Sequence, residues 1–166
     1  RGDASAHFAL GNPDSTVIAV DIHKDNDIAG MAKLQEAVSI LPNLTWIQAW
    51  SWDAVDTVRV LDAKIDILFI DAWHDYQYAK REWDLYSPLL ASPSLVICDD
   101  ITGGFNFDGM VKFWEELPGE KFLNSEVHRG GIPMGFVRYE LLPGLDEVIT
   151  TGKRRGRKPR ESKTHR

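Results

Sequence analysis

Two short apolar segments that end in aspartates constrain the fold of this 166-residue chain more than any other feature. The first runs from Ile65 to Ile70 before Asp71, and the second runs from Leu95 to Cys98 before Asp99 and Asp100. Continuous apolar runs are typical of strands buried in a parallel sheet, and ligands bind beyond the carboxyl ends of such strands. We therefore expect the three acids to converge on one site.

The rest of the chain alternates between strand-like and helix-like segments. Further strands are predicted at 17–20 and 44–47, and the strand before Asp99 is predicted to span 94–98. Helices are predicted at 27–41, 51–61, 76–86 and 108–117, and residues 1–10 are predicted to form a glycine turn that enters a short helix. Strand-like runs at 122–127 and 134–141 are too close together for a crossover helix, so we expect them to form an antiparallel hairpin. The pattern predicts an α/β fold with a Rossmann-like, doubly wound, mostly parallel sheet and an antiparallel C-terminal hairpin.

Charge is distributed unevenly along the chain. Residues 153–166 hold eight Lys or Arg against Glu161 alone, a net charge of +7. Because the whole chain carries −6, residues 1–152 carry −13. We expect one acidic domain at 1–152 and a basic, disordered tail at 153–166.

The basic tail suggests a second kind of partner. Residues 152–160 resemble an AT-hook, the Arg-Gly-Arg-Pro type of peptide that lies in the minor groove of A·T-rich DNA, although Lys158 interrupts the core. The resemblance implies a nucleic-acid partner for residues 153–166, and an alternative function as a nucleic-acid-associated protein. A solvated basic tail with non-specific attraction to nucleic acid stays open as well.

Cysteine content and hydropathy favour a cytoplasmic protein. Cys98 is the single cysteine, which excludes an internal disulfide and fits a reducing compartment. No apolar run approaches the roughly 20 residues of a membrane span, so we expect no membrane partner. The chain opens at Arg1 in the middle of a pattern, and we expect the start of the protein to lie upstream.

The order of segments from Arg1 to about Leu142 resembles the class I S-adenosylmethionine-dependent methyltransferases, whose seven-stranded sheet ends in such a hairpin. Locally the chain is most similar to metal-dependent O-methyltransferases of the catechol and macrolide-sugar types. Their fourth strand ends in an acid followed by a Trp- or His-containing turn, as in residues 69–76, and their fifth ends in Asp-Asp or Asp-Asn, as in residues 98–100. The resemblance implies an O-methyltransferase that acts on a small hydroxylated molecule.

The resemblance also implies which residues contact the nucleoside part of S-adenosylmethionine. Asp21 would accept hydrogen bonds from the ribose hydroxyls, Trp50 would stack on the adenine, and Ser51 would hydrogen-bond it. Asp21 could instead cap the next turn, and Trp50 could be a core residue. A strand-end acid such as Asp21 also suits a nicotinamide-dependent dehydrogenase, which is a further alternative.

One part of the family pattern is nearly absent from the chain. The glycine-rich motif after the first strand is reduced to residues 1–5, in which Gly2 and Ser5 would contact the cofactor together with Asp71. That first strand would lie between the strands that end at Asp21 and Asp71. We therefore expect a sheet that lacks its first strand and has a gap at this place.

The resemblance assigns the remaining acids to catalysis. Asp71, Asp99 and Asp100 would bind Mg²⁺, which prefers oxygen ligands, and carboxylates packed this closely favour a cation on electrostatic grounds. His74 would be the general base that removes the substrate hydroxyl proton, because histidine titrates near neutral pH. The alternatives are acids that cap loops in a metal-free enzyme and a histidine that merely belongs to a surface turn.

Overall fold

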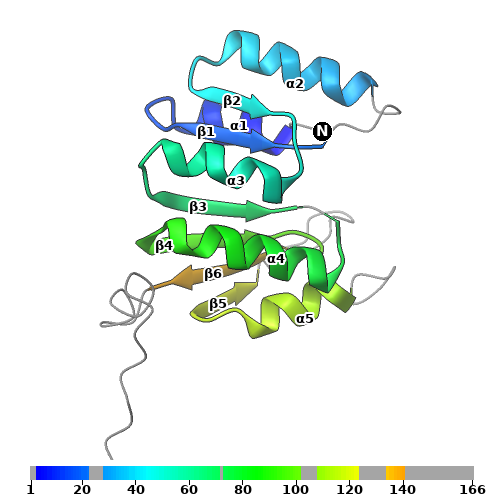
Figure 1. Cartoon of the computed structure of the whole chain (residues 1–166), viewed down its shortest axis with the longest axis vertical. Helices are drawn as coiled ribbons and strands as arrows, with labels where there is room; N and C mark the ends of the chain where they lie inside the picture. The colour runs from blue at the N-terminus through cyan, green and yellow to red at the C-terminus, as the bar shows by residue number, and fades with distance from the viewer. Residues whose placement is uncertain (1–2, 23–27, 72, 102–107, 124–133, 141–166) are drawn as a thin grey trace, which may run out of the picture. The chain divides into compact units, whose positions relative to one another are not determined.

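The computed structural model describes residues 3–22, 28–71, 73–101, 108–123 and 134–140. The chain forms two compact units, the first comprising Arg1–Lys64 with Gln77–Leu89 and the second comprising Ile65–Tyr76 with Leu90–Arg166 (Figure 1). The predicted basic tail lies outside the described residues. Among the described helices, none has the length and apolar character needed to cross a membrane.

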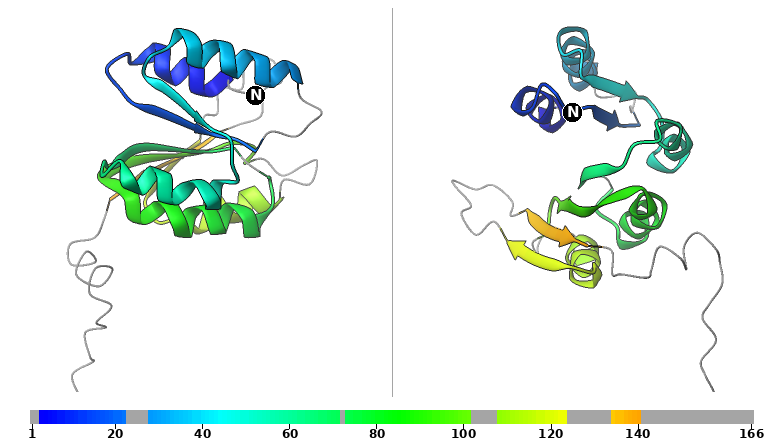
Figure 2. Two further views of the ribbon diagram at one scale, coloured as in Figure 1. Left: turned by 45° about the horizontal axis from the view of Figure 1, so that its top comes forward. Right: turned by 90° about the vertical axis from the view of Figure 1, so that its left-hand side faces the viewer.

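The first unit is built on two parallel strands and four helices. Its elements are α1 (Asp3–Gly11), β1 (Val17–Val20), α2 (Ile28–Ile40), β2 (Leu44–Ile47), α3 (Ser51–Val60), the part of α4 (Tyr76–Tyr86) from Gln77 on, and the short 3₁₀ helix η1 (Ser87–Leu89). The two strands pair in register, from Val17 opposite Leu44 to Val20 opposite Ile47. Within this unit α1 and α2 lie on one side of the two strands, and α3 and α4 lie on the other (Figure 2).

The core of the first unit joins α1 and α2 to the strands. Ala9, Ala19, Leu34 and Leu44 form a buried cluster, with one residue from each of the four elements. The small alanines at the α1–β1 contact allow helix and strand to approach closely. Asn43 Nδ2 donates to the carbonyl oxygen of Ala9 at 3.0 Å, which fixes the end of α1 to the start of β2.

The second unit is a four-stranded sheet with one described helix of its own. Its elements are β3 (Ile65–Ile70), β4 (Leu90–Cys98), α5 (Asp108–Glu116), β5 (Glu120–Leu123) and β6 (Gly135–Tyr139). The strand order is β3-β4-β6-β5, with β3 and β4 parallel and with β6 antiparallel to both β4 and β5. The predicted antiparallel hairpin is therefore confirmed.

The core of this unit lies between the central strands and α5. Val96 and Val137 face each other across β4 and β6 and are completely buried. On α5 the apolar face carries Met110 and Phe113, each about 1% exposed. Burial of a side chain of this size stabilises a fold by roughly 1.5–3 kcal/mol.

The described strands belong to two separate sheets, since β1 pairs with β2 while β3 pairs with β4. The parallel pairs β1–β2 and β3–β4, each accompanied by helices, confirm the predicted α/β class with a mostly parallel core. The missing first strand stays a prediction.

Two strands differ in extent from the sequence prediction. β4 begins at Leu90 instead of residue 94, and its register with β3 shifts between the Ile65–Leu90 pair and the Ile67–Leu95 pair. The irregular part contains Pro93, which hides the strand pattern. β5 begins at Glu120, because charged residues are tolerated on an edge strand; residues 124–127 of the predicted strand lie outside the described residues.

Candidate functional site

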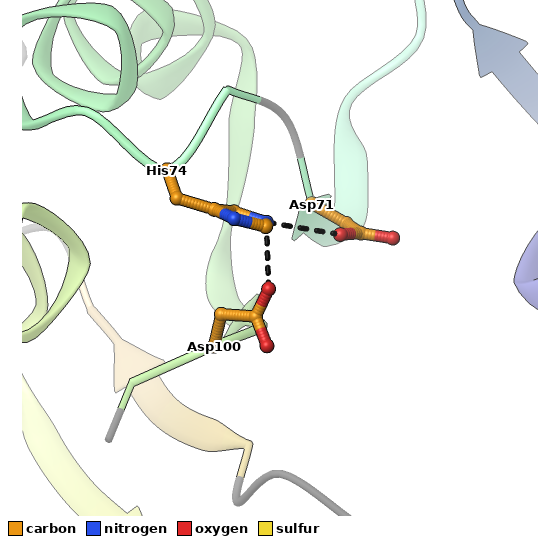
Figure 3. Close-up of side chains that lie close together, drawn as sticks. All are labelled: Asp71, His74 and Asp100. Atoms are coloured by element: carbon orange, nitrogen blue, oxygen red, sulfur yellow. Dashed lines mark ion pairs between the residues drawn. The ribbon is translucent and has the colours of Figure 1, made fainter. Parts of the chain in front are cut away.

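Two acids and a histidine meet at the carboxyl ends of β3 and β4. His74 Nε2 lies 2.7 Å from Asp100 Oδ2 and 3.9 Å from Asp71 Oδ1, as Figure 3 shows. One donor atom from each of the three side chains lies within 4.8 Å of the others. We call these three residues the acid–histidine cluster.

The backbone of the two strands brings the acids together. Asp71 directly follows β3, and the Asp99 amide donates to the carbonyl oxygen of Ile70 at 3.0 Å, one residue beyond the end of the ladder. Asp100 then adopts a left-handed backbone with φ of 53°, a conformation that aspartate tolerates better than most residues. The Asp99 carboxylate supports this turn by accepting a hydrogen bond from the Asp100 amide at 3.0 Å.

The electrostatics of the cluster disfavour ionisation of both of its acids, Asp71 and Asp100. Burial and then the Asp99 carboxylate raise the pKa of Asp71 to about 6, with a further contribution from Asp100 and an opposing one from His74. Burial is also the main cause of the raised pKa of Asp100, which is 6% exposed, and His74 opposes it. A positive charge between these groups would relieve their repulsion.

The structure brings together only part of the predicted metal triad. Asp71 and Asp100 share the cluster with His74, which the sequence analysis assigned to proton removal. Asp99 is not a member of the cluster, and one of its carboxylate oxygens accepts a hydrogen bond from the Asp100 amide. The metal assignment itself stays a prediction.

The loop that carries His74 packs against α5. A Cβ atom at Gly109 would lie 2.7 Å from the Tyr76 amide nitrogen and 3.0 Å from the His74 carbonyl oxygen, so only glycine fits without movement. The Tyr76 hydroxyl donates to Glu116 Oε2 at 2.5 Å, and Lys112 Nζ lies 4.2 Å from the centre of the Tyr76 ring. The first turn of α5 thus helps to set the position of His74.

In the first unit, three predicted cofactor residues lie at one edge of the β1–β2 sheet. The Asp21 amide donates to the carbonyl oxygen of Ile47 at 3.2 Å, so Asp21 lies beside the end of β2. Trp50 and Ser51 follow within four residues of that end, at the start of α3. The Trp50 ring is stacked on Trp52, with centroids 4.7 Å apart.

Two other predicted cofactor residues lie at the start of the chain. Ser5 lies in α1 and is half-buried, and Gly2 lies outside the described residues. Neither assignment is tested by the structure, and both stay predictions.

A buried acid near this edge was missed by the sequence analysis. Glu82 on α4 is 7% exposed, and it accepts a hydrogen bond of 2.6 Å from the Ser51 hydroxyl. Tyr86, one helical turn further on, donates to the Ser51 carbonyl oxygen at 2.7 Å. The spacing of Glu82 from Ala79 and Tyr86 on the buried face of the helix is the signal that could have identified it.

Comparison with known proteins identifies the family. Residues 2–101 match the family model described as a methyltransferase domain. The chain belongs to this methyltransferase family. A search of curated protein sequences found no match.

Solved structures of methyltransferases share the fold. The chain is similar to cofactor-bound Rv0187 from MTB (TM-score 0.63, 15% identity, covering 81% of this chain and 66% of that one). It is also similar to the O-methyltransferase TomG from Streptomyces achromogenes (TM-score 0.61, 15% identity, 84% and 69%). A third is CalS11, a TDP-rhamnose 3′-O-methyltransferase (TM-score 0.58, 18% identity, 81% and 65%). The chain thus spans about two thirds of the length of these proteins.

The predicted resemblance to class I methyltransferases and the predicted enzyme class are therefore confirmed at the level of family and fold. The family assignment favours methyl transfer over the nicotinamide-dependent dehydrogenase considered as an alternative.

Proposed function

We propose that the protein is an S-adenosylmethionine-dependent O-methyltransferase that acts on a small hydroxylated molecule with the help of a divalent metal. The acid–histidine cluster is the observation that supports this most strongly, because it places a base beside carboxylates at the strand ends where this fold binds ligands. The similar structures TomG and CalS11 are O-methyltransferases, and CalS11 acts on TDP-rhamnose.

In this proposal the edge of the β1–β2 sheet holds the nucleoside part of the cofactor. Asp21 accepts hydrogen bonds from the ribose hydroxyls, and Trp50 stacks on the adenine next to Ser51. An acceptor at a strand end and a flat aromatic ring at the same edge fit a nucleoside. When bound, S-adenosylmethionine supplies the methyl group as an electrophile.

The donor atoms of the cluster fit a divalent cation. Asp71 and Asp100 would hold it with their carboxylate oxygens, and Asp99 would join them if its second oxygen turns toward the site. Two or three carboxylates suit Mg²⁺, whereas direct ligation by His74 would favour a softer ion such as Mn²⁺ or Zn²⁺. When bound, the cation acts as a Lewis acid that lowers the pKa of the substrate hydroxyl.

His74 is the proposed general base. Its Nε2 lies 2.7 Å from Asp100 Oδ2, close enough for an ion pair once the ring is protonated. In this proposal the imidazole takes the hydroxyl proton, and Asp100 stabilises the resulting imidazolium. The buried carboxylate thereby orients the ring and balances its charge.

The test is mass-spectrometric detection of methyl transfer from S-adenosylmethionine to hydroxylated small molecules, with and without Mg²⁺, combined with calorimetric titration of the metal. Replacing Asp71 or Asp100 with Asn is expected to weaken Mg²⁺ binding by about tenfold or more, because each change removes one charged ligand. Asp66→Asn is the matched control, since Asp66 is an exposed aspartate on the same strand as Asp71.

The outcomes separate the two parts of the proposal. Methyl transfer that is fully retained in EDTA would exclude the metal and leave the transferase. Failure of the full-length protein to methylate any hydroxylated acceptor, while it binds the cofactor, would contradict O-methylation.

A further inference from the structure

The first two residues of α3, Ser51 and Trp52, both contact α4. Trp50 is stacked on Trp52, and Trp52 is stacked on Tyr78 of α4, with centroids 5.6 Å apart. The Arg81 guanidinium lies 4.2 Å from the centre of the Trp52 ring. Between these two tryptophans, Ser51 is bonded through both its side chain and its backbone to α4. Such dense support indicates that this segment must keep one position.

The buried side chain among these contacts is the acid Glu82, and burial of a carboxylate costs free energy. Glu82 is 7% exposed, and its burial raises its pKa, an effect that the hydrogen bond from Ser51 partly offsets. Tyr86 next to it also has a raised pKa, about 12, because of burial and then the negative charge of Glu82. A neutral side chain would hold two helices together at lower cost, so the carboxylate calls for a reason beyond packing.

We propose that Glu82 is a positioning residue that sets the hydrogen-bond polarity of Ser51 and thereby selects a purine with an exocyclic amino group at the cofactor site. This inference deepens the proposed function and rests on binding of the nucleoside at the β1–β2 edge.

The hydrogen-bond donors and acceptors at Ser51 determine which base the site can accept. An ionised carboxylate can only accept hydrogen bonds, so the single proton of the Ser51 hydroxyl is committed to Glu82 over 2.6 Å. The Ser51 oxygen can then offer only lone pairs to a ligand. The 6-amino group of adenine is a donor and satisfies them, whereas the 6-oxo group of hypoxanthine is an acceptor and faces a second acceptor.

Replacing Glu82 with Gln keeps the size of the side chain and removes this restriction. The Gln amide can donate to the Ser51 oxygen, which frees the hydroxyl proton to point toward the ligand. Ser51 could then donate to a 6-oxo group. The variant is therefore expected to lose discrimination between the two bases while it stays folded.

The experiment is calorimetric titration of the full-length protein with S-adenosylhomocysteine and with its 6-oxo analogue, S-inosylhomocysteine. The wild type is expected to prefer the amino compound by about tenfold, the ratio that corresponds to roughly one hydrogen bond. Glu82→Gln and Ser51→Ala should each bring the ratio close to one, and the double variant should show no further loss. Asp84→Asn is the control, because Asp84 is an exposed α4 residue paired with Lys80, and it should keep the wild-type ratio.

A ratio that is unchanged in Glu82→Gln or in Ser51→Ala, with S-adenosylhomocysteine still bound, would overturn the role of Glu82 and leave the proposed function intact. Binding of neither compound by the wild type would contradict the proposed cofactor, and the inference with it. A merely structural role of Glu82 would lower the melting temperature without changing the ratio of the two affinities. If Glu82→Gln fails to fold, an unchanged ratio in Ser51→Ala would still overturn the inference, because Glu82 is proposed to act through the Ser51 hydroxyl.

Discussion

The contact between Gly109 and the His74 loop gives a prediction whose size can be worked out from the structure. A Cβ atom at this position would lie 2.7 Å from the Tyr76 nitrogen, about 0.8 Å inside an ordinary contact of 3.5 Å. The atoms that it meets belong to the backbone and cannot rotate away. Gly109→Ala must therefore displace either α5 or the loop that carries His74.

The expected loss of stability is the difference between two effects. Overpacking costs roughly 1–3 kcal/mol, and the higher helix propensity of Ala recovers up to about 1 kcal/mol. A net loss of about 1–2 kcal/mol corresponds to a fall in melting temperature of roughly 2–8 °C for a chain of this length. Thermal unfolding followed by circular dichroism measures it, and the NMR signals of the histidine rings report whether His74 moves.

Gly11→Ala is the matched control, because a Cβ atom at Gly11, the last residue of α1, would meet nothing within 4 Å. Its melting temperature is expected to equal or slightly exceed that of the wild type, and the His74 signals should not shift. A Gly109→Ala protein that is as stable as the wild type, with unchanged His74 signals, would refute the view that α5 positions the histidine loop.

Three other predictions concern separate parts of the chain. Cys98 is buried and its thiol pKa is raised to about 12 by burial, so a disulfide reagent at pH 8 should react with it only at the rate of unfolding; fast reaction in native buffer would contradict this. The folded-state pKa of Glu82 is raised above its ordinary value of 4.5, so its contribution to stability is complete below that pH and is lost as the pH rises through the folded value. The free energy of unfolding of Glu82→Gln, measured with denaturant, should therefore increase relative to that of the wild type as the pH rises. A difference between the two free energies that does not change with pH would argue against a buried charge. We also propose that residues 153–166 bind nucleic acid: their deletion should abolish salt-dependent DNA binding in a filter or anisotropy assay, and unaltered binding would exclude the tail.

The sequence was sufficient to predict the class of the fold and the carboxyl ends of β1, β3 and β4. Continuous apolar runs mark these parallel strands, and Asp21, Asp71 and Asp99 directly follow them. Asp71 and Asp100 meet as expected because neighbouring parallel strands end at the same edge. His74 was placed near them by its short distance in sequence from Asp71, which limits how far it can lie from the site.

Side-chain direction could not be predicted in the same way. Asp99 and Asp100 are adjacent in sequence and alike in chemistry, yet Asp100 contacts His74 while Asp99 accepts a hydrogen bond from the Asp100 amide. Glu82 lies 31 residues from Ser51, so its role depends on how α4 packs on α3. The stacking of Trp50 on Trp52 likewise depends on the exact start of α3. These features arise from tertiary contacts, which local patterns do not encode.

The most direct test of the account is calorimetric binding of S-adenosylhomocysteine to the full-length protein and to its Asp21→Ala variant. The wild type is expected to bind with one saturable site, and the variant to bind at least about tenfold more weakly, because it loses a charged acceptor of ribose hydrogen bonds worth roughly 1.5–3 kcal/mol. Absence of saturable binding by the wild type, or equal affinity in the variant, would contradict the assignment of the β1–β2 edge to the cofactor.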